Sequence, residues 1–322
     1  MKVFLSGLAT LGLVALALNP ASAVLFDRIF VFGDSTVDTG WFRYQPLPSD
    51  PTLKALAAAS LADGGRIPDT PYGPGATQVL AASYGLTANP ADNGAGGTNY
   101  AASGAQNNAN FINPHAPSTV SQITNYLSAH GGAADPNALY LISSGGNDIK
   151  YATTLAGQAA RQGWVDNAAA DLADKIAALQ AAGAKNIIVS NAYYVGTTPP
   201  GPATLFTRYW SGLFANLNAL NVTFKRADVQ SLETAIFANP GAYGFTSISN
   251  VDGPNGTALI NPNSALITKS WALYGTTALL RSPNAAQTSF WADDEHFAAR
   301  AQQLEGELFT DVANSLRPSP RN

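Results

Sequence analysis

The sequence predicts an α/β fold in which helices cover both faces of a parallel β-sheet, which is a three-layer α/β/α sandwich. Short apolar runs ending in Gly or Asn alternate along the chain with helix-like stretches. Strands that are apolar over their whole length are typical of parallel sheets, because crossover helices bury both of their faces. No segment repeats at a fixed period and no linker interrupts the pattern, which favours a single domain.

The expected elements follow from these runs. The strand candidates are residues 28–32, 138–142, 186–189 and 221–224, and residues 99–101 could add a short fifth strand. The strongest helix candidate covers residues 165–182, which are rich in Ala, carry Leu172, Ile176 and Leu179 on one stripe, and are followed by Gly183. Two further helices are expected near residues 203–220 and 298–315.

Two segments do not fit the alternation, residues 45–75 and 229–290, and both are dense in Pro, Gly, Asn, Ser and Thr. We expect both to be long surface excursions that begin near strand ends. Sheets of this class bind their ligands at that edge, so the excursions either shape a site or decorate the surface without a role.

Residues 1–23 are typical of a signal peptide. Lys2 precedes an apolar run over residues 3–18, and small residues follow at 21–23. The run is short of the roughly 20 residues that a membrane-spanning helix needs, which leaves an uncleaved anchor as the alternative. We therefore expect residues 24–322 to form one secreted or periplasmic domain, with no integral membrane segment after signal removal.

Composition excludes several classes of function. The chain has no cysteine, which excludes thiol catalysis and cysteine-bound zinc. Its formal net charge is −4, only 12% of its residues are charged, and no Lys/Arg cluster occurs. The sequence therefore lacks the electrostatic footprint of a protein that binds nucleic acid or anionic lipid. The expected partner is a small or weakly charged molecule.

A candidate nucleophile follows the first strand candidate. Gly33, Asp34 and Ser35 come directly after the apolar run of residues 28–32, which places Ser35 at the carboxyl edge of the sheet. A serine hydroxyl is unreactive unless a base lies beside it. Taken alone, the motif fits a turn or a helix cap equally well.

Of the three histidines, only one has carboxylates directly before it. His115 lies in a loop and His130 at an expected helix end, whereas His296 follows the acidic residues 293–295. A carboxylate can accept from one imidazole nitrogen and leave the other to take a proton from a serine. Two alternatives stay open, an acidic first turn that stabilises a helix N-terminus and a carboxylate/histidine metal site.

Two glycine-containing segments could supply hydrogen-bond donors to an oxyanion. Gly145 and Asn147 follow the strand candidate 138–142, which places an amide side chain at the sheet edge. Residues 99–105 offer a backbone N–H at Gly104. Acyl transfer needs donors aimed at the oxygen that becomes negative in the tetrahedral intermediate. Each segment is also compatible with ordinary turn chemistry.

Together these motifs resemble one family, the SGNH/GDSL hydrolases. Four pieces follow the order and approximate spacing of the four family blocks: Gly33-Asp34-Ser35, Gly104, Gly145-x-Asn147-Asp148 and Asp293-x-x-His296. Residues 32–40, 98–105, 243–245 and 290–296 also look like the secreted and plant-type GDSL lipases.

The resemblance implies a flavodoxin-like SGNH hydrolase fold with about five parallel strands. It implies Ser35 as nucleophile, His296 as general base and then acid, and Asp293 as the carboxylate that orients the imidazole. The N–H groups of Ser35 and Gly104 and the side-chain amide of Asn147 would form the oxyanion hole. Such enzymes need no metal and no organic cofactor.

The implied activity is cleavage of a small-molecule or lipid carboxylic ester outside the cytoplasm through an acyl-enzyme on Ser35. Phospholipase, acyltransferase and carbohydrate O-acetyl esterase activities use the same machinery and stay open. A binding protein without catalysis is disfavoured, because no catalytic residue is missing. A flavodoxin-like cofactor binder is disfavoured, because no glycine-rich phosphate loop follows the first strand.

The sequence departs from the family pattern at two positions beside the motifs. Thr36 stands where the family name has Leu, and Phe297 stands where many relatives carry Pro. We expect both to affect the shape of the pocket and not the roles of the site residues. The acidic run 293–295 also leaves open which carboxylate orients His296, and the family spacing favours Asp293.

Overall fold

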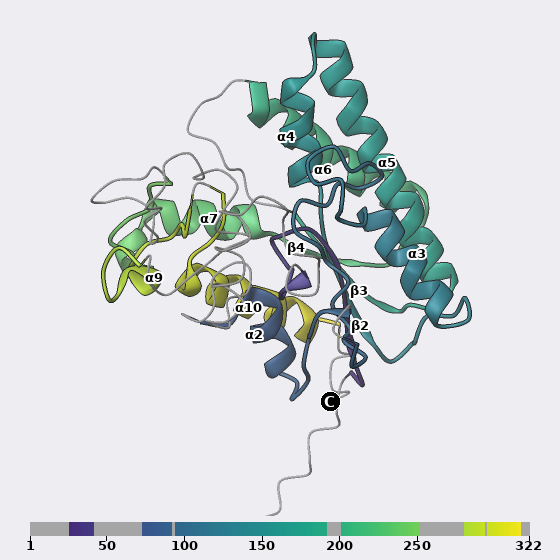
Figure 1. Ribbon diagram of the computed structural model, residues 1–322, viewed down its shortest axis with the longest axis horizontal. Helices are drawn as coiled ribbons and strands as arrows, with labels where there is room; N and C mark the ends of the chain where they lie inside the picture. Colours follow the sequence, from purple (N-terminus) through teal and green to yellow (C-terminus); the bar gives the residue numbers. More distant parts are fainter. Residues whose placement is uncertain are drawn as a thin grey trace, which may run out of the picture.

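A parallel sheet forms the centre of the computed structural model (Figure 1). The structure describes residues 26–41, 73–91, 94–191, 201–250, 280–293 and 295–316. The strands are β1 (Ile29–Gly33), β2 (Leu139–Ser143), β3 (Asn186–Ser190) and β4 (Lys225–Ala227), and they lie side by side in chain order. All three pairings are parallel, so the four carboxyl ends meet at one edge of the sheet.

A further extended segment, residues 98–102, runs parallel to β1 along the edge that does not pair with β2. The Val31 N–H donates to the Thr98 carbonyl at 3.1 Å, and the Tyr100 N–H donates to the Val31 carbonyl at 2.8 Å. These bonds close only an isolated bridge between Val31 and Asn99. The short fifth strand expected at residues 99–101 is therefore reduced to a single bridge beside β1, and the described sheet has four strands.

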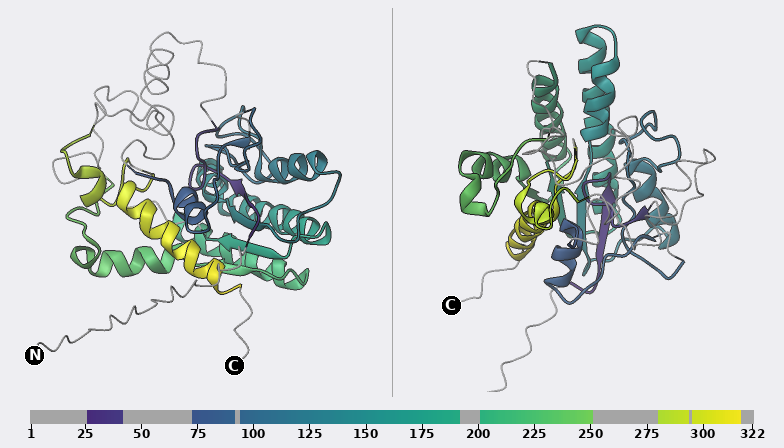
Figure 2. Two further views of the ribbon diagram at one scale, coloured as in Figure 1. Left: turned by 90° about the horizontal axis from the view of Figure 1, so that it is seen from below. Right: turned by 60° about the vertical axis from the view of Figure 1, so that its left-hand side comes forward.

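Helices cover both faces of the sheet, as Figures 1 and 2 show. One face carries α3 (Thr119–Ala129), α4 (Gly146–Thr154), α5 (Gln158–Ala181) and α6 (Gly201–Ala219). The other carries α2 (Ala76–Ala82), α7 (Val229–Ala238) and α10 (Ala299–Asn314), with the short elements η3 (Pro240–Tyr243) and α9 (Ala285–Thr288) beside them. This arrangement confirms the three-layer α/β/α sandwich.

The alternation of side chains along each strand explains why both faces are covered. On β1, Phe30 and Phe32 join one buried cluster with residues of α3, α5 and α6. Ile29 and Val31 join a second cluster with residues of α2, α7 and α10. Because successive side chains point to opposite faces, a wholly apolar strand is stable only between two layers of helices.

Helix and strand predictions are confirmed, with shifted ends, for three of the four strands and all three helices. The helix expected at residues 165–182 begins earlier, at Gln158. The strand expected at residues 221–224 is wrong, because Asn221 has a φ of +54° in the turn after α6 and β4 begins only at Lys225. Val222 is buried and Phe224 is partly buried against α6 instead, where the Phe224 ring stacks on Phe214.

The expected excursion at residues 229–290 is also wrong in its first part, because α7 occupies Val229–Ala238. The Asp228 side chain caps this helix by accepting from the Ser231 N–H at 3.2 Å, and Val229 and Ile236 are buried one above the other. Residues 251–279 lie outside the described residues, as do residues 45–72 of the other excursion.

The expected signal peptide at residues 1–23 also lies outside the described residues. Within the ranges that the structure describes, no helix combines the length and the apolar character needed to cross a bilayer.

Candidate active site

Ser35 lies at the carboxyl edge of the sheet, in a tight turn directly after β1. The end of β1 is fixed to α3, because the Gln122 side-chain amide bonds both the Gly33 N–H and the Gly33 carbonyl, at 2.8 and 2.9 Å. The Asp34 carboxylate accepts from the backbone and hydroxyl of Thr36 at 3.0 and 2.8 Å. With its neighbours held on both sides, the Ser35 side chain is presented outward from the sheet.

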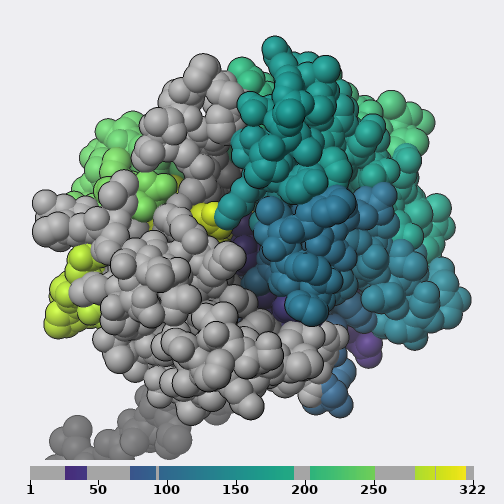
Figure 3. All heavy atoms as spheres, turned by 45° about the horizontal axis from the view of Figure 1, so that its top comes forward, coloured from purple at the N-terminus to yellow at the C-terminus, as the bar shows by residue number. Residues whose placement is uncertain are grey.

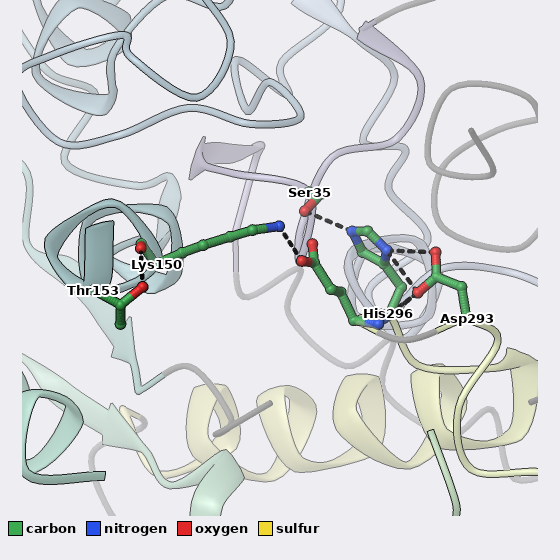
Figure 4. A network of polar contacts seen from close by, with 6 residues as sticks. Ser35, Lys150, Thr153, Asp293 and His296 are labelled. Atoms are coloured by element: carbon green, nitrogen blue, oxygen red, sulfur yellow. Dashed lines mark hydrogen bonds and ion pairs between the residues drawn. The ribbon is translucent and has the colours of Figure 1, made fainter. Parts of the chain in front are cut away.

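His296 and Asp293 meet Ser35 from the other end of the chain (Figure 4). The His296 Nε2 lies 2.8 Å from Ser35 Oγ, and the His296 Nδ1 lies 2.9 Å from Asp293 Oδ2. A carboxylate oxygen can only accept, so Nδ1 carries the ring proton and Nε2 is free to accept from the serine hydroxyl. The three residues therefore have the geometry of a nucleophile, its base and the orienter of that base.

The loop that carries His296 is anchored by aromatic packing. The Ala292 N–H donates to the His296 carbonyl at 2.7 Å, which closes the loop as a narrow turn. Phe290 and Phe297 flank it with ring centroids 4.6 Å apart, and both are buried beneath the sheet. Inside the turn, Asp293 Oδ1 accepts from the backbone N–H of His296 at 2.6 Å. The side chains are thus fixed before a substrate binds.

Gly104 and Asn147 belong to two segments that border the Ser35 turn. Gly104 has a φ of +81°, and a Cβ there would come within 2.6 Å of the Asn113 Cβ, so the position requires glycine. Asn147 lies in the first turn of α4 and donates one amide hydrogen to the Ala105 carbonyl at 3.0 Å. That bond orients the amide and leaves its second hydrogen for another acceptor.

Contacts between the three segments place them side by side. The Ala102 N–H donates to the Gly33 carbonyl at 3.0 Å, which places the Gly104 loop against the Ser35 turn. A Cβ at Gly146 would lie 3.8 Å from the Asp34 carboxylate, which places the start of α4 there as well. Within the part of the chain that the structure describes, the N–H groups of Ser35 and Gly104 donate to no protein acceptor.

The other two histidines lie elsewhere. His115 is exposed in the loop before α3. His130 caps the C-terminus of α3, where its Nδ1 lies 2.8 Å from the Tyr126 carbonyl and its ring packs on Phe30, in the first half of β1. The expected helix end at His130 is confirmed.

Glu295 does not lie in the first turn of α10, so it does not stabilise the N-terminus of that helix. It forms an ion pair with Lys150 of α4, so a salt bridge joins α4 to the His296 loop (Figure 4). Both side chains are partly exposed, and such pairs contribute about 0 to 1 kcal/mol. Asp294 lies outside the described residues. Among the residues described, no group of His, Cys, Asp and Glu is arranged to hold a metal.

A family model described as GDSL-like Lipase/Acylhydrolase matches residues 29–246. The chain belongs to this family. The match includes the Ser35, Gly104 and Asn147 segments and ends before the loop of Asp293 and His296.

Two curated relatives and two solved structures illustrate the similarity. Lipase 1 of Photorhabdus luminescens is 39% identical over 104 residues, 32% of this chain and 16% of that protein. An uncharacterized protein from the trpE-trpG intergenic region of Pseudomonas putida is 27% identical over 270 residues, 76% of this chain and 43% of that protein. The chain thus spans less than half the length of either curated relative.

The solved structures are distant in sequence. A lipolytic G-D-S-L family protein from Veillonella parvula is 15% identical, with a TM-score of 0.46 over 88% of this chain and 97% of that one. An extracellular lipase from Streptomyces rimosus is 14% identical, with a TM-score of 0.42 over 90% of this chain and 99% of that one.

Buried carboxyl groups surround the GDSL site. Burial raises the pKa of Asp34 to about 6, although the bonds from Thr36 oppose the shift. Burial also raises the pKa of Asp148 to about 8, despite a bond from the Asn107 N–H at 2.9 Å. On α10, burial raises the pKa of Glu305 well above its usual range, and its Oε2 has no partner among the residues described.

Sequence analysis missed Lys150 and Glu305. Lys150 pairs with a residue 145 positions away, so no local pattern could indicate the contact. Glu305 shares the buried stripe of α10 with Gln302 and Phe309, at helical spacing. The position of Glu305 on that stripe could have predicted a buried carboxyl group.

Substitutions of Asp293 and Glu295 distinguish the carboxylate that orients the His296 ring from the one that only pairs with Lys150 at the surface. Asp293→Asn should lower kcat by about 10-fold or more, because the imidazolium that forms at His296 loses its negative partner. The acid limb of the kcat/KM profile should also move to lower pH. Glu295→Gln should stay within a few-fold of wild type. Steady-state kinetics from pH 5 to 9 at equal thermal stability tests both, and a larger loss for Glu295→Gln would contradict the assignment.

Asp148→Asn should alter the pH dependence of stability. Between about pH 4 and 8 the unfolded chain releases the Asp148 proton while the folded chain retains it, so the free energy of unfolding of the wild type falls as pH rises. The slope contributed by this group approaches about 1.4 kcal/mol per pH unit. Asparagine does not titrate, so the variant should gain stability relative to wild type from pH 4 to 8. Urea denaturation at pH 4, 6 and 8 measures this, and a constant difference would contradict it.

Proposed function

We propose that this protein is an extracytoplasmic serine hydrolase that cleaves carboxylic esters through an acyl-enzyme on Ser35. The observation that carries the proposal is the chain of contacts from Ser35 Oγ to His296 Nε2 at 2.8 Å and from His296 Nδ1 to Asp293 at 2.9 Å. Membership of a lipase/acylhydrolase family supports an ester as the bond that is cleaved.

The first half of the reaction follows from these positions. Ser35 Oγ attacks the ester carbonyl carbon while His296 Nε2 takes its proton, and Asp293 stabilises the imidazolium. The carbonyl oxygen becomes negative and accepts from the N–H groups of Ser35 and Gly104 and from the free amide hydrogen of Asn147. Because these donors are already oriented, little reorganisation is needed as the charge develops.

The second half returns the enzyme to its starting state. The imidazolium donates its proton to the leaving alcohol, and the acyl group remains on Ser35 Oγ. His296 then takes a proton from a water molecule, which attacks the acyl carbon. The imidazolium returns this proton to Ser35 Oγ as the bond between the acyl carbon and Oγ breaks, which releases the carboxylic acid and restores the serine hydroxyl. None of these steps uses a metal or a cofactor.

Export is proposed on the sequence of residues 1–23, whose charged start, apolar run and small-residue end are typical of a signal peptide. The name of the Photorhabdus relative, a lipase, favours lipid or other apolar esters among the possible substrates.

Ser35→Ala should abolish turnover of 4-nitrophenyl acetate while leaving the fold intact. Losses of about 10³-fold or more are typical when the nucleophile is removed. A fluorophosphonate should label the wild type once, at Ser35, and leave the variant unlabelled by mass spectrometry. Ser83→Ala, which removes an exposed hydroxyl at the C-terminus of α2, is the matched control. Normal turnover by well-folded Ser35→Ala would overturn the proposal.

Asn147→Ala should lower kcat by roughly 10² to 10³-fold with a smaller change in KM, because its bond to the substrate oxygen strengthens in the transition state. The control is Asn108→Ala, which removes an exposed amide that bonds Asp171. If kcat of Asn147→Ala equalled that of the control, Asn147 would serve only to hold the Ala105 loop.

A further inference from the structure

An aromatic cluster lies beside the proposed oxyanion hole and takes no part in the chemistry described above. Phe111 and Tyr151 stack with centroids 4.8 Å apart and ring planes at 12°, and Trp164 packs 4.6 Å from Tyr151. Phe111 is nevertheless 60% exposed. In the described part of the chain, Leu220 is the only other large hydrophobic residue with comparable exposure. Tyr151 and Trp164 are themselves only half-buried, so the three rings form one continuous aromatic surface that a ligand can contact.

Two elements connect this cluster to the oxyanion hole. Asn147 and Tyr151 are four residues apart on α4, so they lie on the same face of the helix. Gly104 and Phe111 belong to the same loop. Loop and helix touch at the hole, through Asn147 and Ala105, and touch again where Phe111 stacks on Tyr151. The cluster therefore begins about one helical turn, ~5.4 Å, from the oxyanion donors.

The loop holds Phe111 in place. The buried Gln106 side chain accepts from the N–H groups of Phe111 and Ile112 at 2.6 and 3.1 Å. The next residue, Asn107, bonds the buried Asp148 carboxyl through its N–H and Tyr209 through its side chain. The ring is thus positioned without a ligand, so binding against it incurs little ordering cost.

The position of α4 indicates which part of an ester meets the cluster. His296 must protonate the leaving alcohol, so the alcohol lies on the His296 side of Ser35. In Figure 4, α4 with Lys150 and Thr153 lies on the opposite side of Ser35 from His296. Figure 3 shows the purple and yellow segments exposed at the bottom of a hollow that blue and teal segments border. The wall formed by the loop and α4 therefore faces the acyl group.

We propose, building on the ester hydrolysis proposed above, that Phe111, Tyr151 and Trp164 form a subsite that binds an apolar acyl chain. An acetyl group ends one bond beyond the carbonyl and does not reach the rings. A chain of about five carbons or more spans the ~5.4 Å of one helical turn and does reach them. The preferred substrates are thus esters of medium-chain fatty acids, and acetylated carbohydrates are disfavoured.

Acyl-chain selectivity tests the subsite. The ratio of kcat/KM for 4-nitrophenyl octanoate to that for 4-nitrophenyl acetate should fall by about 10-fold in Phe111→Ala, because the chain loses apolar contact. Phe111→Trp should retain most of the ratio. Leu220→Ala, which removes an exposed hydrophobic side chain in the turn after α6, should leave the ratio unchanged. An equal loss on both esters, or no loss on either, would overturn the proposal.

Two further measurements separate the subsite from its alternatives. Varying the alcohol from 4-nitrophenol to ethanol at constant acyl group should not change the effect of Phe111→Ala. If the effect followed the alcohol, the cluster would bind the leaving group and the acyl assignment would be wrong. Calorimetric titration of Ser35→Ala with octanoate should show binding that Phe111→Ala weakens. If the wild type binds octanoate but hydrolyses neither ester, the proposed function is wrong and the subsite is supported. If octanoate does not bind, the proposed subsite is wrong.

Discussion

The contact between Ser35 and His296 depends on the return of the last loop of the chain to the end of its first strand. These residues are 261 positions apart in sequence and 2.8 Å apart in space. Closing such a separation costs conformational entropy, which apolar burial must offset. Phe290 and Phe297 supply that burial on either side of the histidine, and α10 continues it by packing along α2.

Buried carboxyl groups lie at the same edge of the sheet, where their charged forms are destabilised by the loss of water. Asp34 and Asp148 lie beneath the site, and each is deprived of water. Natural proteins mostly keep ionisable side chains out of the interior, and they depart from such rules mainly at functional sites. Here the departure is concentrated where Ser35 and Asn147 must be held to a fixed geometry. Asp34 accepts from the backbone N–H of Thr36, and Asp148 accepts from that of Asn107. These bonds explain why acidic residues occupy buried positions next to Ser35 and Asn147.

Local patterns in the sequence predicted the layers, because wholly apolar runs and a one-sided Ala-rich helix each have one stable placement. They failed where burial was achieved without a strand, as at Val222 and Phe224, and where an amphipathic helix was hidden by its polar surroundings, as in α7. The site residues could be named because their motifs keep a fixed order. Lys150 and the Phe111 cluster could not, since their contacts join segments distant in sequence and arise only in the folded chain.

The proposed chemistry depends on how the His296 loop and α10 pack against the rest of the fold. One face of the sheet forms a buried cluster with α3 to α6, whereas Phe290 and Phe297, which flank the histidine, belong to the cluster that the other face forms with α2, α7 and α10. Proteins open in cooperative units, and a terminal helix with its preceding loop is a natural unit of that kind. Detachment of this segment would remove the base from Ser35 and would expose the face of the sheet that α10 covers. If the segment opens as such a unit, heating should abolish the proposed catalysis before the layer of α3 to α6 unfolds.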